Sequence, residues 1–155
     1  MLSGKLYNQM IRQSLYTKVY ITSAQILALF STPINIILGQ SGMFYIPEIV
    51  HWVKEAGTAY TLNGSTNLKL QWANGTACGQ AANAGFMDQT GQLTAFTQAA
   101  SSAASYYSVF SASLLTAING ANIQLTTETA NLTLGTGGLI LTILYRQYPM
   151  VIPFN

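Results

Sequence analysis

The densest group of residues capable of acid–base or metal chemistry lies between positions 48 and 55, where the chain carries Glu48, His51, Lys54 and Glu55. On a β-strand, successive side chains point to opposite faces. Glu48 and Lys54 then share one face, and His51 and Glu55 share the other. A zinc site needs at least three protein ligands that converge on one point. The spacing therefore predicts no metal site, and predicts ordinary exposed ion pairs on a solvated sheet face.

The sequence also lacks the residue patterns expected for nucleophilic catalysis. His51 is the only histidine, and no Gly-x-Ser-x-Gly segment presents a serine to it. Cys78, the only cysteine, could act as a nucleophile only if the fold brought His51 beside it. The glycine-rich segment 135–138 lacks the Lys and Ser or Thr of a phosphate loop. We therefore expect no enzyme, with no catalytic residue, no bound cofactor and no metal.

The composition points to contacts with other proteins. Only 6% of the residues are charged while 50% are hydrophobic, whereas soluble domains carry about a quarter charged residues. No apolar run approaches the roughly 20 residues of a spanning helix, so no membrane partner is expected. The six cations are scattered along the chain, which argues against nucleic acid as a partner. A charge-poor surface of this kind favours a subunit of a protein assembly.

The elements that must position these residues are mostly strands. Alternating or β-branched segments are bounded by Asn-Gly pairs and glycine-rich turns, a pattern typical of antiparallel sheets. Pro47 cannot donate a ladder hydrogen bond, so it predicts an edge or a bulge. The apolar final segment is expected to be a central strand. The predicted strands are 15–22, 33–38, 43–54, 67–73, 82–87, 122–129 and 139–148.

Two segments have helical features. Thr22 or Ser23 can cap a short helix near 23–30, and Pro33 prevents its continuation. Residues 92–118 place apolar side chains at three-four spacing, which predicts a helical insert, although 106–110 would suit a strand equally well. The fold class expected from the whole chain is all-β, an antiparallel β-sandwich with this possible insert.

The first 14 residues form a separate segment before a single β-sandwich domain at 15–155. Leu2, Leu6, Met10 and Ile11 fall on one side of a possible helix. Three interpretations are open: the segment folds over its own domain, it is a frayed terminus, or it is an arm that docks on a neighbouring subunit. The third makes these four residues the candidate docking site.

A resemblance adds to these inferences. The segment 24–33 (AQILALFSTP) is followed by an apolar strand, a glycine-rich turn and Ile46-Pro47, and the pattern closes with 137–146 (GGLILTILYR). Over residues 15–148, this succession resembles small virion proteins of tailed bacteriophages. The resemblance implies a jelly-roll-like β-sandwich that oligomerises on the capsid or tail, and it implies no catalytic residue.

The resulting hypothesis is a non-enzymatic virion structural protein, a capsid decoration or cement subunit that stabilises the shell by protein–protein contacts. Its partners would be the major capsid protein or other virion subunits, and it would form a homo-oligomer, with a trimer favoured. Its location would be the virion, assembled in the host cytoplasm. The alternative is a carbohydrate- or receptor-binding β-sandwich module on a tail or head fibre or knob. Exposed coplanar aromatic rings in a pocket would favour that alternative.

Overall fold

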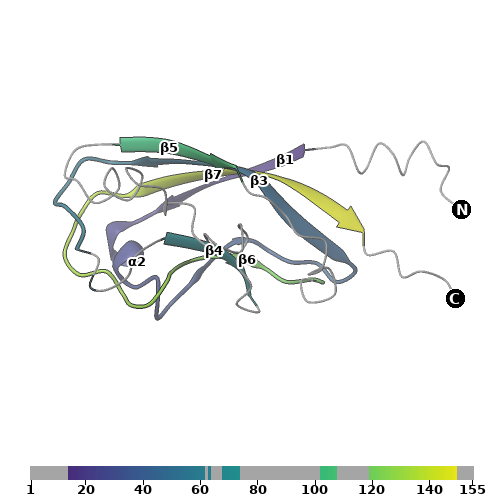
Figure 1. The fold of residues 1–155 in the computed structure, drawn as a ribbon, viewed down its shortest axis with the longest axis horizontal. Coiled ribbons are helices and arrows are strands. Elements are labelled where there is room, and N and C mark those ends of the chain that lie inside the picture. The colour runs from purple at the N-terminus through teal and green to yellow at the C-terminus, as the bar shows by residue number, and fades with distance from the viewer. Residues whose placement is uncertain (1–13, 62, 64–67, 74–101, 108–118, 150–155) are drawn as a thin grey trace, which may run out of the picture.

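The computed structural model describes residues 14–61, 63, 68–73, 102–107 and 119–149, with the backbone alone for 102–107. These residues form seven strands and one short helix (Figure 1). All strand pairs are antiparallel, which confirms the mostly antiparallel β class predicted from the sequence. The elements are β1 (Ser14–Ile21), α2 (Ser23–Leu27), β2 (Ile34–Ile37), β3 (Met43–Lys54), β4 (Leu68–Trp72), β5 (Ser102–Tyr107), β6 (Ile123–Thr127) and β7 (Leu139–Pro149).

The strands are divided between two sheets. The first has the order β1-β7-β3-β5, and the second has the order β2-β6-β4, so successive strands among the described residues belong to different sheets. Three of the pairs are nested: β1 with β7, β2 with β6, and β3 with β5. The predicted central place of the last strand is confirmed, because β7 lies between β1 and β3.

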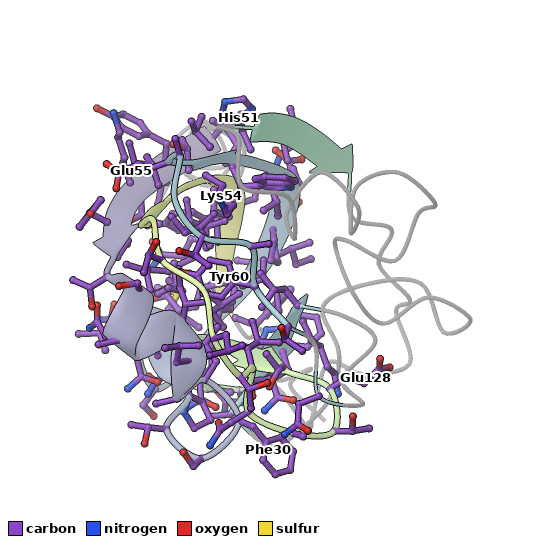
Figure 2. All side chains as sticks on the ribbon, turned by 90° about the vertical axis from the view of Figure 1, so that its left-hand side faces the viewer. Phe30, His51, Lys54, Glu55, Tyr60 and Glu128 are labelled. Carbon is purple, nitrogen blue, oxygen red and sulfur yellow. The ribbon has the colours of Figure 1, made fainter. Side chains whose placement is uncertain are left out.

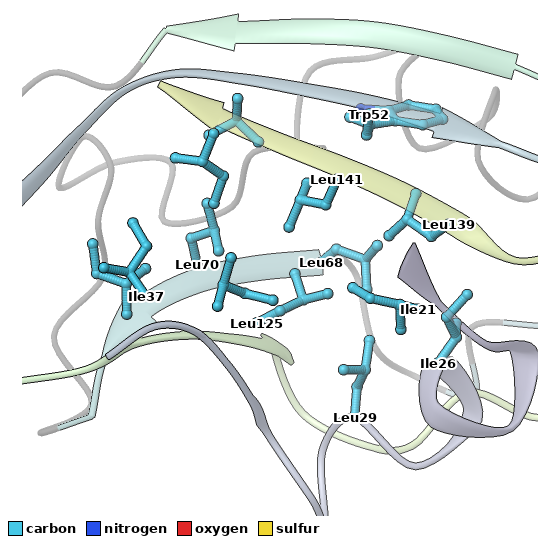
Figure 3. Packing of buried hydrophobic residues seen from close by; sticks show 14 of the residues in the cluster. Ile21, Ile26, Leu29, Ile37, Trp52, Leu68, Leu70, Leu125, Leu139 and Leu141 are labelled. Carbon is cyan, nitrogen blue, oxygen red and sulfur yellow. The ribbon is translucent and has the colours of Figure 1, made fainter. Parts of the chain in front are cut away.

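The hydrophobic core lies between the two sheets (Figure 3). Alternation along each strand supplies it: β7, for example, turns Leu139, Leu141 and Ile143 inward, all without exposed surface. Trp52 from β3 and Trp72 from β4 are the largest buried side chains of the cluster. The Trp72 indole Nε1 donates to the main-chain oxygen of Tyr45, 3.1 Å away, and so links the second sheet to the first.

The helix α2 closes one end of the core. Thr22 caps it, since its hydroxyl accepts from the Gln25 amide while the Gln25 side chain accepts from the Thr22 amide. Its residue Ile26 is fully buried and joins the core cluster. The helix ends at Leu27 rather than reaching position 30 as predicted. The Asn131 side-chain oxygen accepts from the amides of residues 30 and 31, which ties the following turn to the loop after β6.

Two further sequence predictions can be compared with the structure. Pro47 lies at a register shift between β3 and β7, which confirms the bulge, and the described pairing of β3 with β5 begins only at Ile49. The predicted helical insert is wrong for residues 102–107, because they pair with β3 as strand β5. The rest of 92–118, the strand predicted at 82–87 and Cys78 lie outside the described residues. No helix in the described part of the chain has the length and hydropathy needed to span a membrane.

Candidate functional site

The predicted docking residues Leu2, Leu6, Met10 and Ile11 lie outside the described residues. The first strand begins at Ser14, one residue before the predicted start of the domain. Among the described residues, no three His, Cys, Asp or Glu side chains are grouped so that they could hold a metal ion. The remaining candidates for a functional site are the ionisable groups of β3 and the outer faces of the two sheets.

Glu48 and Lys54 do not form the exposed pair predicted from parity. The bulge after Pro47 turns Glu48 to the outer face, where its carboxylate lies 2.7 Å from the Arg146 Nε. Lys54 points to the core and has no exposed surface, because it continues the inward series of Val50 and Trp52. The prediction that Glu48 and Lys54 share a solvated face is wrong, since the bulge interrupts the alternation between them.

Lys54 belongs to a polar cluster at the end of the first sheet (Figure 2). Its ammonium donates to the main-chain oxygen of Glu55 at 2.9 Å and lies 5.7 Å from the ring centre of Tyr60. The Glu55 carboxylate accepts from the Tyr20 hydroxyl at 2.9 Å and from the Gly138 amide at 3.0 Å. These contacts join the ends of β1 and β3 to the start of β7.

The electrostatics of the cluster follow from its burial. Burial lowers the pKa of Lys54, because removal of water disfavours the charged ammonium. Burial, followed by the nearby Tyr20 and Glu55, raises the pKa of Tyr60 to about 12. The hydroxyl of Tyr60 donates to the main-chain oxygen of residue 137 at 2.6 Å. Each of these groups thus has a structural contact, and together the contacts hold this end of the fold.

Replacement of Tyr60 by phenylalanine is expected to change the alkaline stability profile. A raised folded pKa means that Tyr60 stabilises the fold fully below pH 10 and that this contribution disappears as the pH rises through about 12. The difference between the folded and unfolded pKa values of Tyr60 corresponds to about 2 to 3 kcal/mol. Tyr60→Phe should cost about 1 kcal/mol at pH 8 through the lost hydrogen bond. Between pH 10 and 12, the free energy of unfolding of Tyr60→Phe should fall by about 2 to 3 kcal/mol less than that of the wild type.

Denaturant unfolding followed by the fluorescence of the two buried tryptophans would measure this profile. Tyr16→Phe is the matched control, because Tyr16 is 73% exposed on β1. Parallel alkaline losses in wild type and Tyr60→Phe would contradict the assignment.

The outer faces of the two sheets differ sharply. On the three-stranded sheet, Asn35, Gln124 and Gln71 form a cross-strand row, with a 2.9 Å hydrogen bond from the Gln124 side chain to that of Asn35. Lys69 follows at the next outward position of β4. A polar outer face is the usual partner of an apolar inner one in an antiparallel sheet. The outer face of the three-stranded sheet is therefore suited to contact with water.

The outer face of β1, β7 and β3, which we call the outer apolar face, is different. One cross-strand row consists of Tyr20, Ile140 and Val53, and another consists of Tyr16, Leu144 and Ile49. Further along, Phe44 and Tyr148 stack with ring centres 5.1 Å apart. Tyr16 and Tyr20 are 73% and 54% exposed. Both faces of this sheet are therefore rich in apolar side chains, although only one faces the core.

Comparisons with known proteins add little to this geometry. The sequence matches no family model and no curated protein. Among solved structures, the cyanophage Pam1 capsid asymmetric unit is similar, with a TM-score of 0.37 and 13% sequence identity over 88% of this chain and 84% of that chain. The function has to be argued from the residues and strands of this chain.

Proposed function

We propose that this chain is a non-enzymatic structural subunit of a tailed-phage virion, a decoration or cement protein that binds the capsid through its outer apolar face. The observation that carries the proposal is the contrast between the two sheets. The three-stranded sheet has a polar outer row at Asn35, Gln124 and Gln71. The four-stranded sheet instead presents two apolar rows, separated by one polar row. Large apolar patches on a protein surface mark sites of protein–protein contact.

The strand arrangement supports the same proposal. The nested pairs β1–β7, β2–β6 and β3–β5, with successive described strands in different sheets, are compatible with a jelly roll. Jelly rolls are frequent among viral capsid proteins. This topology agrees with the fold that the resemblance of 24–33 and 137–146 to small virion proteins implies.

The mechanism of such a subunit is mechanical. A subunit seated across neighbouring shell proteins binds the assembled shell and not its separated parts, so its binding free energy opposes separation. The outer apolar face of the three strands spans on the order of 400 Å². That is about half the area that each partner contributes to a standard interface. A homo-oligomer, for which we favour a trimer, would present several such faces at once and gain avidity.

The proposal is tested on particles of the phage that encodes the chain. Mass spectrometry of purified virions should find the chain in copies that scale with the number of capsid subunits, and electron cryomicroscopy should place it on the shell. The native mass of the isolated protein gives the oligomer number. A stable soluble monomer that is absent from purified particles would contradict the proposal.

A further inference from the structure

The outer apolar face has a polar row at its centre. Lys18, Thr142 and His51 lie opposite one another across β1, β7 and β3, between the two apolar rows described above. Lys18 is exposed, and its outward neighbours along β1 are Tyr16 and Tyr20. In the described part of the chain, no ion pair involves Lys18. A cation thus stands on the edge strand of this face, between the exposed Tyr16 and Tyr20 of the two apolar rows.

In the described part of the chain, the carboxylates on or beside this face already have partners. Glu48 pairs with Arg146 at 2.7 Å, and Glu55 accepts hydrogen bonds from Tyr20 and Gly138. Glu128 lies on the opposite side of the molecule from His51 (Figure 2). Packing this face on the same face of a second copy would add another cation and would bring no described carboxylate that is not already engaged. A buried ammonium needs an opposite charge and hydrogen-bond acceptors.

We infer that the outer apolar face docks on a different protein whose matching surface is apolar and carries a carboxylate opposite Lys18. This inference rests on the proposed function, in which that protein is a subunit of the capsid shell. The apolar rows supply the buried area, and the Lys18–carboxylate pair fixes the register of docking. The polar outer face of the second sheet then points away from the shell.

The test compares two equivalent charge reversals. Lys18 lies on the outer apolar face, and Lys69 lies on the outer face of the other sheet. Both residues are on strands, and replacement of either by Glu changes the net charge by the same amount. The purified proteins are fluorescently labelled and titrated onto particles assembled by a phage deleted for the gene. Lys18→Glu should weaken binding at least tenfold, and Lys69→Glu should change it by less than about twofold. Lys18→Arg should restore most of the binding.

The controls separate failure of this inference from failure of the proposed function. Unfolding midpoints of all variants establish that each is folded, and the exposure of Lys18 predicts midpoints close to the wild type. If the wild type binds and Lys18→Glu binds equally well, the docking face is wrong while the proposed function stands. If the wild type does not bind the particles, the proposed function itself is contradicted.

Two further outcomes would assign the face to other occupants. A fall in the native mass of the isolated protein caused by Lys18→Glu would show that the face joins copies of this chain. Binding of the wild type to vesicles containing phosphatidylserine, lost in Lys18→Glu and retained in Lys69→Glu, would assign it to a lipid surface. Either result would overturn the inference of a protein partner that carries a carboxylate.

Discussion

Replacement of Trp72 by alanine is expected to lower the free energy of unfolding by about 3 to 5 kcal/mol, the range for deletion of a large buried aromatic side chain. Trp72 on β4 is 2% exposed and packs in the core between the sheets. Its indole also donates to the Tyr45 main-chain oxygen on β3. Trp72→Ala would therefore remove a large side chain from the core and a hydrogen bond between the two sheets.

Two companion variants divide this loss into its parts. Trp72→Phe keeps most of the ring volume and removes the hydrogen bond to Tyr45, so it should cost about 1 to 3 kcal/mol. Gln71→Ala, on the outward side of the same strand, should remain within about 0.5 kcal/mol of the wild type. Denaturant unfolding would be followed through the fluorescence of Trp52, which all three variants retain. A loss below 1 kcal/mol for Trp72→Ala would contradict the described packing.

Replacement of Gly39 by alanine should destabilise the protein by about 3 kcal/mol, the upper end of the usual cost of overpacking, because its methyl group would have to displace backbone. A Cβ at Gly39 would lie 2.0 Å from the main-chain oxygen of Gly120. The Gly39 amide also donates to the Asn122 side chain at 2.7 Å, so the segment after β2 has little freedom to move aside. Overpacking against backbone costs more than overpacking against a side chain that can rotate.

Gly42 provides the control three residues later. A Cβ there has no atom within 4 Å, but its φ of +78° lies in the left-handed region. Gly42→Ala should therefore cost about 1 to 2 kcal/mol through backbone strain alone. Thermal and denaturant unfolding of both variants would establish the order. A smaller loss at Gly39 than at Gly42 would mean that the two loops after β2 and before β6 are not in contact as described.

The sequence predicted the strands whose pattern is local. β1 alternates clearly, and β7 begins with a segment rich in Leu and Ile that only Thr142 interrupts, so both could be located within a few residues. β5 could not, because its Ser and Ala residues have no strong period of their own and its strand conformation depends on pairing with β3. The tertiary register, which no local pattern records, decides the structure of such a segment.

The candidate site was less predictable than the strands. Pro47 correctly indicated a bulge, yet the face of Glu48 was inferred by counting parity across it, which placed Glu48 beside Lys54. In the sequence, the outer apolar face could be inferred only from the largely apolar segment 139–148. That segment predicted a central strand, but it did not predict that one face of this strand lies outside the core. The pairing of β7 with β1 and β3 shows which side chains share that face.

The nested pairing of strands has a consequence for the order of events during synthesis. β1 is made first but obtains its sheet neighbour only when β7, near the other end of the chain, has emerged from the ribosome. Non-local pairs of this kind carry a high contact order, so folding is expected to be slow, on a timescale of milliseconds to seconds. During that interval, the tyrosine-rich β1 is an unpaired strand open to pairing with other nascent chains. The step that buries it, closure of β7 between β1 and β3, is therefore the one most exposed to misassembly.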